Sequence, residues 1–389
     1  MKPDFQLKDV EVYLDNAATT AMDEGVVDAM RPYFEERYGN PETVYRLGRE
    51  AKDAVEKSRA TIADVLKCKP GEICFTSGGT EANNWAIKGT ADAYGADNGV
   101  IVSAIEHASV LETARWVSRN APYYEVPVDE LGLVDLTMLE LELASKKYGL
   151  VSIQYANNEI GTVQPVAKIS ELCKKYDAVF HCDAVQAFGK IAFDVDDVGA
   201  DLISLSAHKI HGPMGVGALY VKSGANIEPL LHGGGQERGM RSGTLAVPEI
   251  VGFGKAVELA IDALPSHMPR LSATIDTLAA MMCQTFKAKR NGHPTLRLPN
   301  ILNVTMPGVE TEVLCGVMCS KYSTCMSAGA ACSTSKRESH VLKAIGRDPK
   351  DVLSTLRISL SKFNTDKQVQ AAFYQLQAAN REAGLRSLI

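Results

Sequence analysis

Lys209 is the residue of this sequence whose type and position most directly suggest chemistry. It follows the apolar, β-branched run 201–206 and comes directly before the turn Ile210-His211-Gly212-Pro213, a pattern typical of a strand that ends abruptly. Because ligands of open α/β sheets bind outside the carboxyl ends of the strands, the Lys209 amine would face a crevice. A partly desolvated amine can lose its proton and form a Schiff base with a carbonyl cofactor. The alternative interpretation is an ordinary surface lysine at a strand end.

A glycine-rich turn, Ser77-Gly78-Gly79-Thr80, lies between a predicted strand, 72–76, and a predicted helix that runs to about Ala93. Small residues let the backbone approach an anion closely, and the free N–H groups of a helix N-terminus bind phosphate. The turn has neither the Walker lysine nor the GxGxxG spacing. It therefore indicates the phosphate of some other small cofactor, and a simple helix cap is an equally good interpretation of the turn alone.

Polar side chains follow two other predicted strands. Asp183 comes after the apolar run 178–182, where a carboxylate needs a partner to keep its charge. The pyridinium nitrogen of pyridoxal phosphate is such a partner, and Gln186 could donate to the ring hydroxyl oxygen. His107 follows the predicted strand 99–103, where an imidazole could lie flat on a cofactor ring. Taken separately, Asp183 could equally be a helix N-cap, and His107 a structural histidine.

The elements that would position these residues alternate between strands and helices. Most of the predicted strands are continuous apolar runs, which indicates an α/β domain with a mainly parallel, seven-stranded sheet covered by helices on both faces. A helix near 248–263 and the proline-flanked Ala263-Leu264-Pro265-Ser266 predict a boundary there. We expect a large domain over 15–263 and a smaller α+β domain from 1–14 and 264–389, with strands such as 301–305 and 355–360. The seven strands are predicted at 72–76, 99–103, 123–128, 150–155, 178–182, 201–206 and 216–221.

Composition excludes several classes of function. The chain has 389 residues, a net charge of -6 and no basic block, so binding to nucleic acid or to an anionic membrane is disfavoured. No apolar run approaches the roughly 18 residues of a membrane span, and the N-terminus lacks a signal-peptide core. The nine cysteines are scattered without a spaced framework, so we expect free thiols, no metal site and a cytoplasmic location.

The order of these features along the chain resembles the fold-type-I pyridoxal-phosphate enzymes, specifically the class V aminotransferase group and, within it, the cysteine desulfurases. The phosphate turn, the strand-end His and Asp, and Ser206-Ala207-His208-Lys209 all take part in the resemblance. Four further segments extend it over nearly the whole chain: 14–20, Tyr38-Gly39-Asn40-Pro41, Ala156-Asn157-Asn158-Glu159-Ile160-Gly161 and Arg241-Ser242-Gly243-Thr244.

The resemblance implies a role for each residue around pyridoxal 5′-phosphate. Lys209 would bind the cofactor covalently, Asp183 its ring nitrogen and Gln186 its ring oxygen, while His107 would stack on the ring. Asn158 and Arg357 would hold the carboxylate of the substrate, L-cysteine. The phosphate would be held by Gly79, Thr80, Ser206 and His208, with Thr244 supplied by the second subunit of a homodimer.

The segment Ser327–Thr334 carries the predicted nucleophile, Cys332. Seven of its eight residues are Ser, Ala, Gly or Thr, so little side-chain packing would fix it, and we expect a mobile loop. In the resembled group, such a cysteine attacks the substrate sulfur and carries it as a persulfide to an acceptor such as an iron–sulfur scaffold. Because a free thiol is mostly protonated at neutral pH, His107 is expected to assist it. Cys325 is the rival nucleophile.

One segment departs from the resembled pattern. After Asn40-Pro41 the group usually continues with two serines, whereas this chain has Glu42-Thr43-Val44-Tyr45. Two alternatives also remain open. Selenocysteine lysis or transamination would keep Lys209 and Asp183 without needing Cys332, and a non-catalytic sulfur-relay protein could share the same fold.

Overall fold

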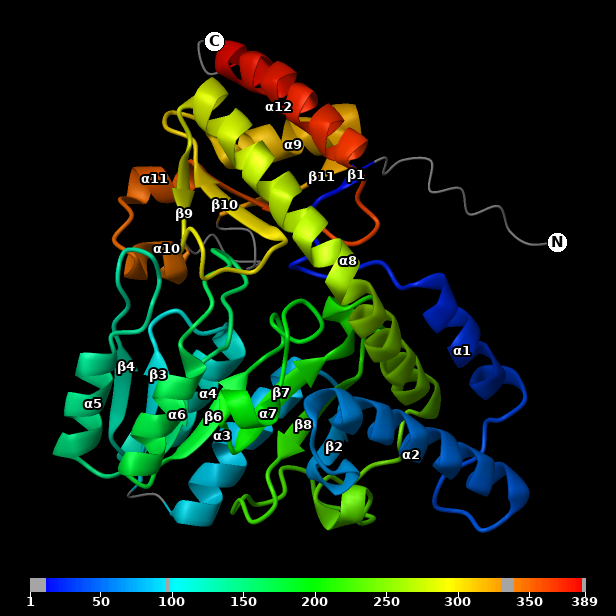
Figure 1. Ribbon diagram of the computed structural model, residues 1–389. Coiled ribbons are helices and arrows are strands. Elements are labelled where there is room, and N and C mark those ends of the chain that lie inside the picture. The colour runs from blue at the N-terminus through cyan, green and yellow to red at the C-terminus, as the bar shows by residue number, and fades with distance from the viewer. Residues whose placement is uncertain (1–11, 96–97, 330–338, 387–389) are drawn as a thin grey trace.

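The computed structural model describes residues 12–95, 98–329 and 339–386. Figure 1 shows two bodies, each built on its own sheet, with the long helix α8 (Val247–Phe286) running from one into the other. The larger body contains the seven strands that the sequence predicts, and their bounds agree with the prediction to within three residues. The predicted α/β class is therefore confirmed.

The seven strands form one sheet in the order β2-β8-β7-β6-β5-β3-β4. β8 runs antiparallel to both of its neighbours, and every other pair is parallel. All strands except β8 consequently end at the same edge of the sheet, where an α/β protein binds its ligands. The strands are β2 (Ile73–Thr76), β3 (Gly99–Ser103), β4 (Tyr123–Val126), β5 (Tyr148–Ser152), β6 (Val179–Asp183), β7 (Leu202–Ser206) and β8 (Gly217–Val221).

Helices cover both faces of this sheet. On one face, α3 and α4 pack through Trp85 and Leu111 onto strand residues such as Leu150. On the other face, α2, α5, α6 and the first half of α8 enclose residues such as Phe180. Successive strand residues are therefore buried on opposite faces, which explains the continuous apolar runs. The helices of this body are α1 (Glu24–Glu35), α2 (Arg46–Leu66), α3 (Gly79–Tyr94), α4 (Ala108–Val117), α5 (Leu136–Ser145), α6 (Val166–Lys175) and α7 (Val195–Val198), with short 3₁₀ turns at η1 (Pro70–Glu72), η2 (Ser118–Asn120), η3 (Ala207–Lys209) and η4 (Glu237–Gly239).

The smaller body has an antiparallel sheet in the order β12-β13-β10-β9. Its core joins Leu302 and Leu356 of this sheet to Leu278 of α8 and Phe373 of α12, and the N-terminal Val12 belongs to it as well. Its elements are β1 (Val12–Tyr13), β9 (Lys289–Asn291), β10 (Ile301–Thr305), α9 (Thr311–Tyr322), β11 (Thr324–Cys325), β12 (Ser327–Ala328), α10 (His340–Ala344), α11 (Pro349–Leu353), β13 (Thr355–Ser359) and α12 (Asp366–Arg386).

The helix expected to end near residue 263 was predicted wrongly. α8 continues through Pro265 and Pro269 to Phe286. A proline inside a helix removes a backbone hydrogen bond and disfavours the helix, yet tertiary packing holds α8 on both sides of these positions. Its first half is buried against α1 and α2, and its second half contributes Leu271 and Ile275 to the second core. The division of the chain into two domains near residue 263 stays a prediction.

A buried ion pair fixes the loop that precedes α8. Glu237 accepts two hydrogen bonds of 2.7 Å from the guanidinium of Arg59 and one of 2.8 Å from the N–H of Phe75. The side chains of Arg59 and Glu237 are only 2% and 1% exposed. Glu237 also has a φ of 51°, which is unfavourable for a residue other than glycine. The ion pair therefore holds a strained backbone in place.

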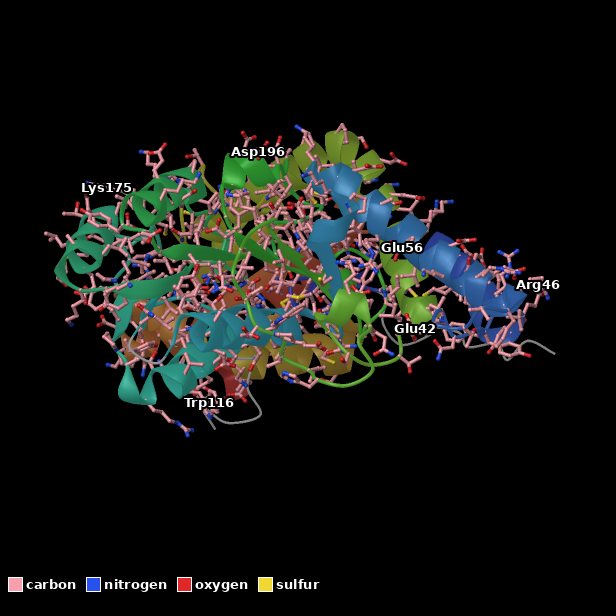
Figure 2. The ribbon with its side chains drawn as sticks, turned by 90° about the horizontal axis from the view of Figure 1, so that it is seen from below. Glu42, Arg46, Glu56, Trp116, Lys175 and Asp196 are labelled. Atoms are coloured by element: carbon pink, nitrogen blue, oxygen red, sulfur yellow. The ribbon has the colours of Figure 1, made fainter. Side chains whose placement is uncertain are left out.

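We expect Glu237→Gln to lower the free energy of unfolding by about 3 kcal/mol, because it removes the buried carboxylate that pairs with Arg59 and leaves only the exposed Glu56 near that buried charge. Glu56 offers a matched control, since it lies 3.2 Å from the same guanidinium but its side chain is 51% exposed. Figure 2 labels it on α2, the helix whose outer end carries Arg46. Glu56→Gln should cost less than about 1 kcal/mol. Urea unfolding of both variants checks this, and equal losses would contradict the role given to burial.

Candidate active site

A cavity of about 790 Å³ opens at the carboxyl ends of the parallel strands. Residues from β6, β7, the first turn of α3 and the segment after β3 meet in its wall. Nine of the residues predicted from the sequence line it: Gly79, Thr80, His107, Asn158, Asp183, Gln186, Ser206, His208 and Lys209.

Lys209 reaches this cavity from the 3₁₀ turn η3 that directly follows β7. Its Nζ donates hydrogen bonds of 2.7 Å to the carbonyl oxygen of Ala17 and 2.6 Å to that of Ala18. These two carbonyl oxygens orient the amine. The half-buried lysine is consequently held inside the cavity wall rather than extended into solvent, as expected for a reactive amine.

Asp183 ends β6 and is 7% exposed. One carboxylate oxygen accepts a 2.7 Å hydrogen bond from Nδ2 of Asn83, and the other accepts a 3.0 Å bond from the N–H of Val185. Each oxygen of this buried carboxylate thus has a hydrogen-bond donor. The helix N-cap interpretation of Asp183 is wrong, because residues 185–190 form turns and no helix. The carboxylate closes the turn after β6 and also faces the cavity.

The predicted phosphate turn forms the entrance to α3, whose first residue is Gly79. A Cβ atom on Gly79 would lie 2.7 Å from Cγ2 of Val185, so only glycine fits there. A Cβ atom on Gly217 of β8 would lie 2.7 Å from Cα of Gly78, so the turn also packs tightly against the sheet. The N-terminus of the 16-residue helix α3 therefore faces the cavity and favours an anion at that end.

His107 caps α4 and also lines the cavity. Its Nδ1 accepts a 3.1 Å hydrogen bond from the N–H of Ser109. Desolvation by the surrounding protein lowers the pKa of His107, the charge of Asp183 opposes this effect, and the charge of Lys209 adds to it. The imidazole is thus predominantly neutral at pH 7, as a base that accepts a thiol proton must be.

The two residues predicted to hold the substrate carboxylate occupy different positions. Asn158 lines the cavity, whereas Arg357 of β13 lies behind it and is 3% exposed. One guanidinium nitrogen of Arg357 donates to the backbone oxygen of Asn158 at 3.1 Å, and another to Asp15 at 2.7 Å. The cavity surface as described does not include Arg357. Its predicted contact with substrate stays a prediction.

Two other predicted residues lie away from this cavity or outside the description. Thr244 is exposed and does not line the cavity of its own chain. The loop that carries it is held by Arg241, which donates two hydrogen bonds to Glu81 of α3 at 2.7 and 3.0 Å. Cys332 falls in 330–338, outside the described residues. The roles of Thr244 and Cys332 stay predictions.

Sequence reasoning missed several residues of the cavity wall. Asn83 and Gln154 both line it, and Asn83 is the side-chain donor to Asp183. Behind them, Glu106 is buried and accepts two 3.0 Å hydrogen bonds from the N–H of Gln154. Burial raises the pKa of Glu106 to about 8. Asn83 follows the phosphate turn by three residues, but only its contact with Asp183, 100 residues away, identifies its role.

The residues present fit pyridoxal 5′-phosphate. The cavity combines an amine for the aldehyde, a carboxylate for the ring nitrogen and a helix N-terminus for the phosphate. Two buried polar atoms in its wall, Oγ of Ser206 and Oδ1 of Asn83, have no hydrogen-bond partner among the described residues. Buried polar atoms of this kind normally have a partner, and a bound phosphate or ring substituent would supply one.

His181, in the middle of β6, lies between two serines of neighbouring strands. Its Nδ1 is 2.7 Å from Oγ of Ser152, and its Nε2 is 2.9 Å from Oγ of Ser204. Complete burial lowers the pKa of His181 to about 3. The unfolded chain therefore binds a proton near pH 6.5 that the folded chain excludes, so stability is lost as the pH falls from about 6.5 towards about 3.

We expect this histidine to contribute about 2 kcal/mol to the loss of unfolding free energy between pH 7 and pH 5. His181→Gln keeps polar contacts with both serines but does not titrate, so it should lose less stability over that range. The exposed His232 provides the control, because His232→Gln should leave the pH dependence unchanged. Urea unfolding at both pH values checks this. A pH dependence identical in all three proteins would contradict the assignment.

The fold and the cavity together define the class of protein, an enzyme that uses pyridoxal 5′-phosphate. The model of the aminotransferase class-V family matches residues 12–372. The chain therefore belongs to the aminotransferase class-V family. Among its relatives is a protein of Methanosarcina thermophila named "Cysteine desulfurase IscS", which is 44% identical over 364 residues, 92% of this chain and 89% of the relative.

Solved structures give the same result. A structure described as "NIFS-LIKE PROTEIN" has a TM-score of 0.88 and 38% identity, and the match covers 97% of this chain and all of the other. A second, described as "SspA in complex with cysteine", has a TM-score of 0.79 and 36% identity over 91% of this chain and all of the other. The resemblance inferred from the sequence is confirmed at the level of the family and the fold.

The described part of the chain lacks two further features. In residues 12–95, 98–329 and 339–386, no helix is both long and apolar enough to cross a membrane. The same residues include no group of three or more His, Cys, Asp or Glu side chains that could hold a metal ion.

Proposed function

We propose that the protein is a cysteine desulfurase, which removes sulfur from L-cysteine with pyridoxal 5′-phosphate, releases L-alanine and keeps the sulfur as a persulfide on Cys332. The observation that carries this proposal is the cavity in which the amine of Lys209 and the carboxylate of Asp183 face one space. The relatives named cysteine desulfurase support the choice of substrate, and so does a similar structure described as a complex with cysteine.

Each residue of the cavity has a defined task in this proposal. The bound cofactor supplies an electron sink for the Cα of the amino acid. Lys209 binds the cofactor and then, as a free amine, removes the Cα proton of the substrate. Asp183 keeps a positive charge on the ring nitrogen, and Gln186 donates to the ring oxygen. The phosphate is held by Gly79, Thr80, Ser206 and His208.

The sulfur-transfer step follows from the chemistry of a thiolate. The Sγ atom of Cys332 attacks the sulfur of the substrate, so an S–S bond forms as the Cβ–S bond of the substrate breaks. The electron pair of that bond remains on the carbon skeleton, which takes up protons and leaves as alanine. L-cysteine and one protein thiol are thereby converted into L-alanine and one persulfide, with no external oxidant. The neutral imidazole of His107 accepts the thiol proton.

Asn158 and Arg357 orient the substrate. Asn158 lines the cavity, and its backbone oxygen already accepts a hydrogen bond from Arg357. A guanidinium has five N–H donors, so Arg357 can bind a substrate carboxylate while keeping its contact with Asp15. We propose that a small shift of this arginine completes the substrate site.

The partners and location are further parts of the proposal. The protein acts as a homodimer in which Thr244 reaches the phosphate of the second subunit, since Thr244 is exposed and does not line its own cavity. The persulfide is passed to an acceptor, for which an iron–sulfur scaffold is our first candidate, and the reaction takes place in the cytoplasm. Pull-down of persulfide-loaded protein with transfer of labelled sulfur tests the acceptor.

The decisive experiment uses the wild-type chain. Purified protein is saturated with pyridoxal 5′-phosphate and incubated with L-cysteine, and alanine and protein-bound persulfide are measured. We expect both products, and equal amounts in the first turnover. Selenocysteine and alanine serve as comparison substrates. A protein that stays colourless with added cofactor, or that forms no alanine from cysteine, would contradict the proposal.

A further inference from the structure

Lys190 is a buried lysine next to the cofactor cavity that the proposed mechanism does not use. It lies four residues after Gln186 and is 6% exposed. Its Nζ donates a 2.8 Å hydrogen bond to Oε1 of Gln186. Among residues 12–95, 98–329 and 339–386, this is the one hydrogen bond that its side chain makes.

Burying a lysine without a carboxylate partner is unfavourable. Burial, together with the nearby charge of Lys209, lowers the pKa of Lys190 to about 7. A methionine or leucine would fill the same volume without this cost. The burial of Lys190 therefore indicates that its hydrogen bond to Gln186 has a function.

The contacts of Gln186 define the orientation of its side-chain amide. Nε2 donates a 2.9 Å hydrogen bond to the carbonyl oxygen of Ala17, and the same oxygen accepts the 2.7 Å bond from Lys209. Turning the amide over would place its oxygen against the oxygen of Ala17 and its NH₂ group against the donor of Lys190. Lys190 and Ala17 therefore select the same orientation from opposite ends of the amide.

We propose that Lys190 is a positioning residue of the cofactor site, which holds the amide of Gln186 with its NH₂ group turned towards Ala17 and the cavity. One N–H of that group is bound to Ala17, and the other is then directed to the ring oxygen of pyridoxal 5′-phosphate. This inference rests on the proposed function, because it assumes that Gln186 meets this cofactor. Lys190 itself touches neither cofactor nor substrate.

The test is a double-mutant cycle on cofactor binding. Apoproteins of the wild type, Lys190→Met, Gln186→Ala and the double variant are titrated with pyridoxal 5′-phosphate, and the Kd and the position of the visible absorption band are recorded. We expect Lys190→Met to raise the Kd about tenfold, the size expected for one hydrogen bond. Because Lys190 acts through Gln186, the double variant should bind no more weakly than Gln186→Ala alone.

Two further variants complete the cycle. Lys190→Arg retains donors and should restore the Kd to within about threefold of the wild type, since a geometric mismatch costs less than the missing donor. Lys168→Met removes an exposed lysine of α6 and should change neither the Kd nor the absorption band. Thermal unfolding of each apoprotein shows whether it is folded. Should Lys190→Met fail to fold, Lys190→Leu, which also lacks a donor, replaces it in the cycle.

Each outcome decides the proposal. Non-additive effects of Lys190→Met and Gln186→Ala, a shifted absorption band and recovery with arginine support it. Additive effects, an unchanged Kd, or a failure of both neutral variants to fold overturn it and leave Lys190 with a structural role. These results leave the proposed function intact as long as the wild type binds the cofactor and forms alanine. A wild type that binds no pyridoxal 5′-phosphate overturns both.

Discussion

Lys209→Ala is expected to lower alanine formation from L-cysteine by at least about 1,000-fold, because it removes both the covalent attachment of the cofactor and the base that takes the Cα proton. The variant should fold normally, since Lys209 is half-buried and donates hydrogen bonds to two backbone oxygens that can bind water instead. Borohydride should abolish the visible absorption band of the purified wild-type protein and, in the same reduction, leave the cofactor permanently attached to the chain. Lys209→Ala should trap none.

Lys222 provides the matched control, because it also follows a strand directly. It comes after β8, which is antiparallel to its neighbours, so it leaves the sheet at the opposite edge. Its side chain is 46% exposed and lies 3.4 Å from Asp201. Lys222→Ala should keep activity within about twofold of the wild type, as expected for a surface substitution. Equal losses in the two variants would contradict the role of Lys209, as would full activity of Lys209→Ala.

The contrast between these two lysines shows what the sequence could predict. Both follow apolar runs, and strand direction alone decides which one reaches the cavity. Lys209 is followed by a turn that ends the strand, and the other candidate groups also follow predicted strands. Because the carboxyl ends of parallel strands lie at one edge of a sheet, the sequence placed all of these groups at that edge. Asp183 and His107 were found in the same way. Local pattern and the resemblance together thus predicted the sheet and nine residues of the cavity wall.

Features that depend on contacts between distant segments were not predictable. α8 continues through Pro265 and Pro269 because its second half is buried in the smaller body, whereas local sequence favours a break there. Asn83 meets Asp183 across 100 residues of sequence. The tasks of Asn83 and of Lys190 depend on such contacts, and an isolated asparagine or lysine in a sequence carries no comparable signal.

Arg357 illustrates a different limit. The resemblance assigned it to the substrate carboxylate, and the structure places it on β13 with its charge paired to Asp15. The pair holds the guanidinium behind Asn158. A buried arginine with a carboxylate partner is stable as it stands, so sequence alone could not state whether the side chain is already in the position that binds substrate.

Cys332→Ala is expected to abolish persulfide formation and to lower alanine formation by at least about 1,000-fold, because a nucleophile that accepts the sulfur has no substitute in the mechanism. Cofactor binding should be unchanged, so the visible absorption band of Cys332→Ala should match that of the wild type. The measurement is alanine release together with the mass of the intact protein, which gains one sulfur atom in the wild type.

Cys325 is the control that separates the two candidate nucleophiles. It lies half-buried on β11, and burial, followed by the neighbouring Cys319, raises its pKa above the ordinary value for a thiol. A raised pKa means that less thiolate is available at neutral pH, and the thiolate is the reactive form. Cys325→Ala should therefore retain alanine formation within about twofold. Loss of activity in Cys325→Ala together with full activity in Cys332→Ala would identify Cys325 on β11 as the nucleophile. The comparison is direct, because both variants are measured with the cofactor bound.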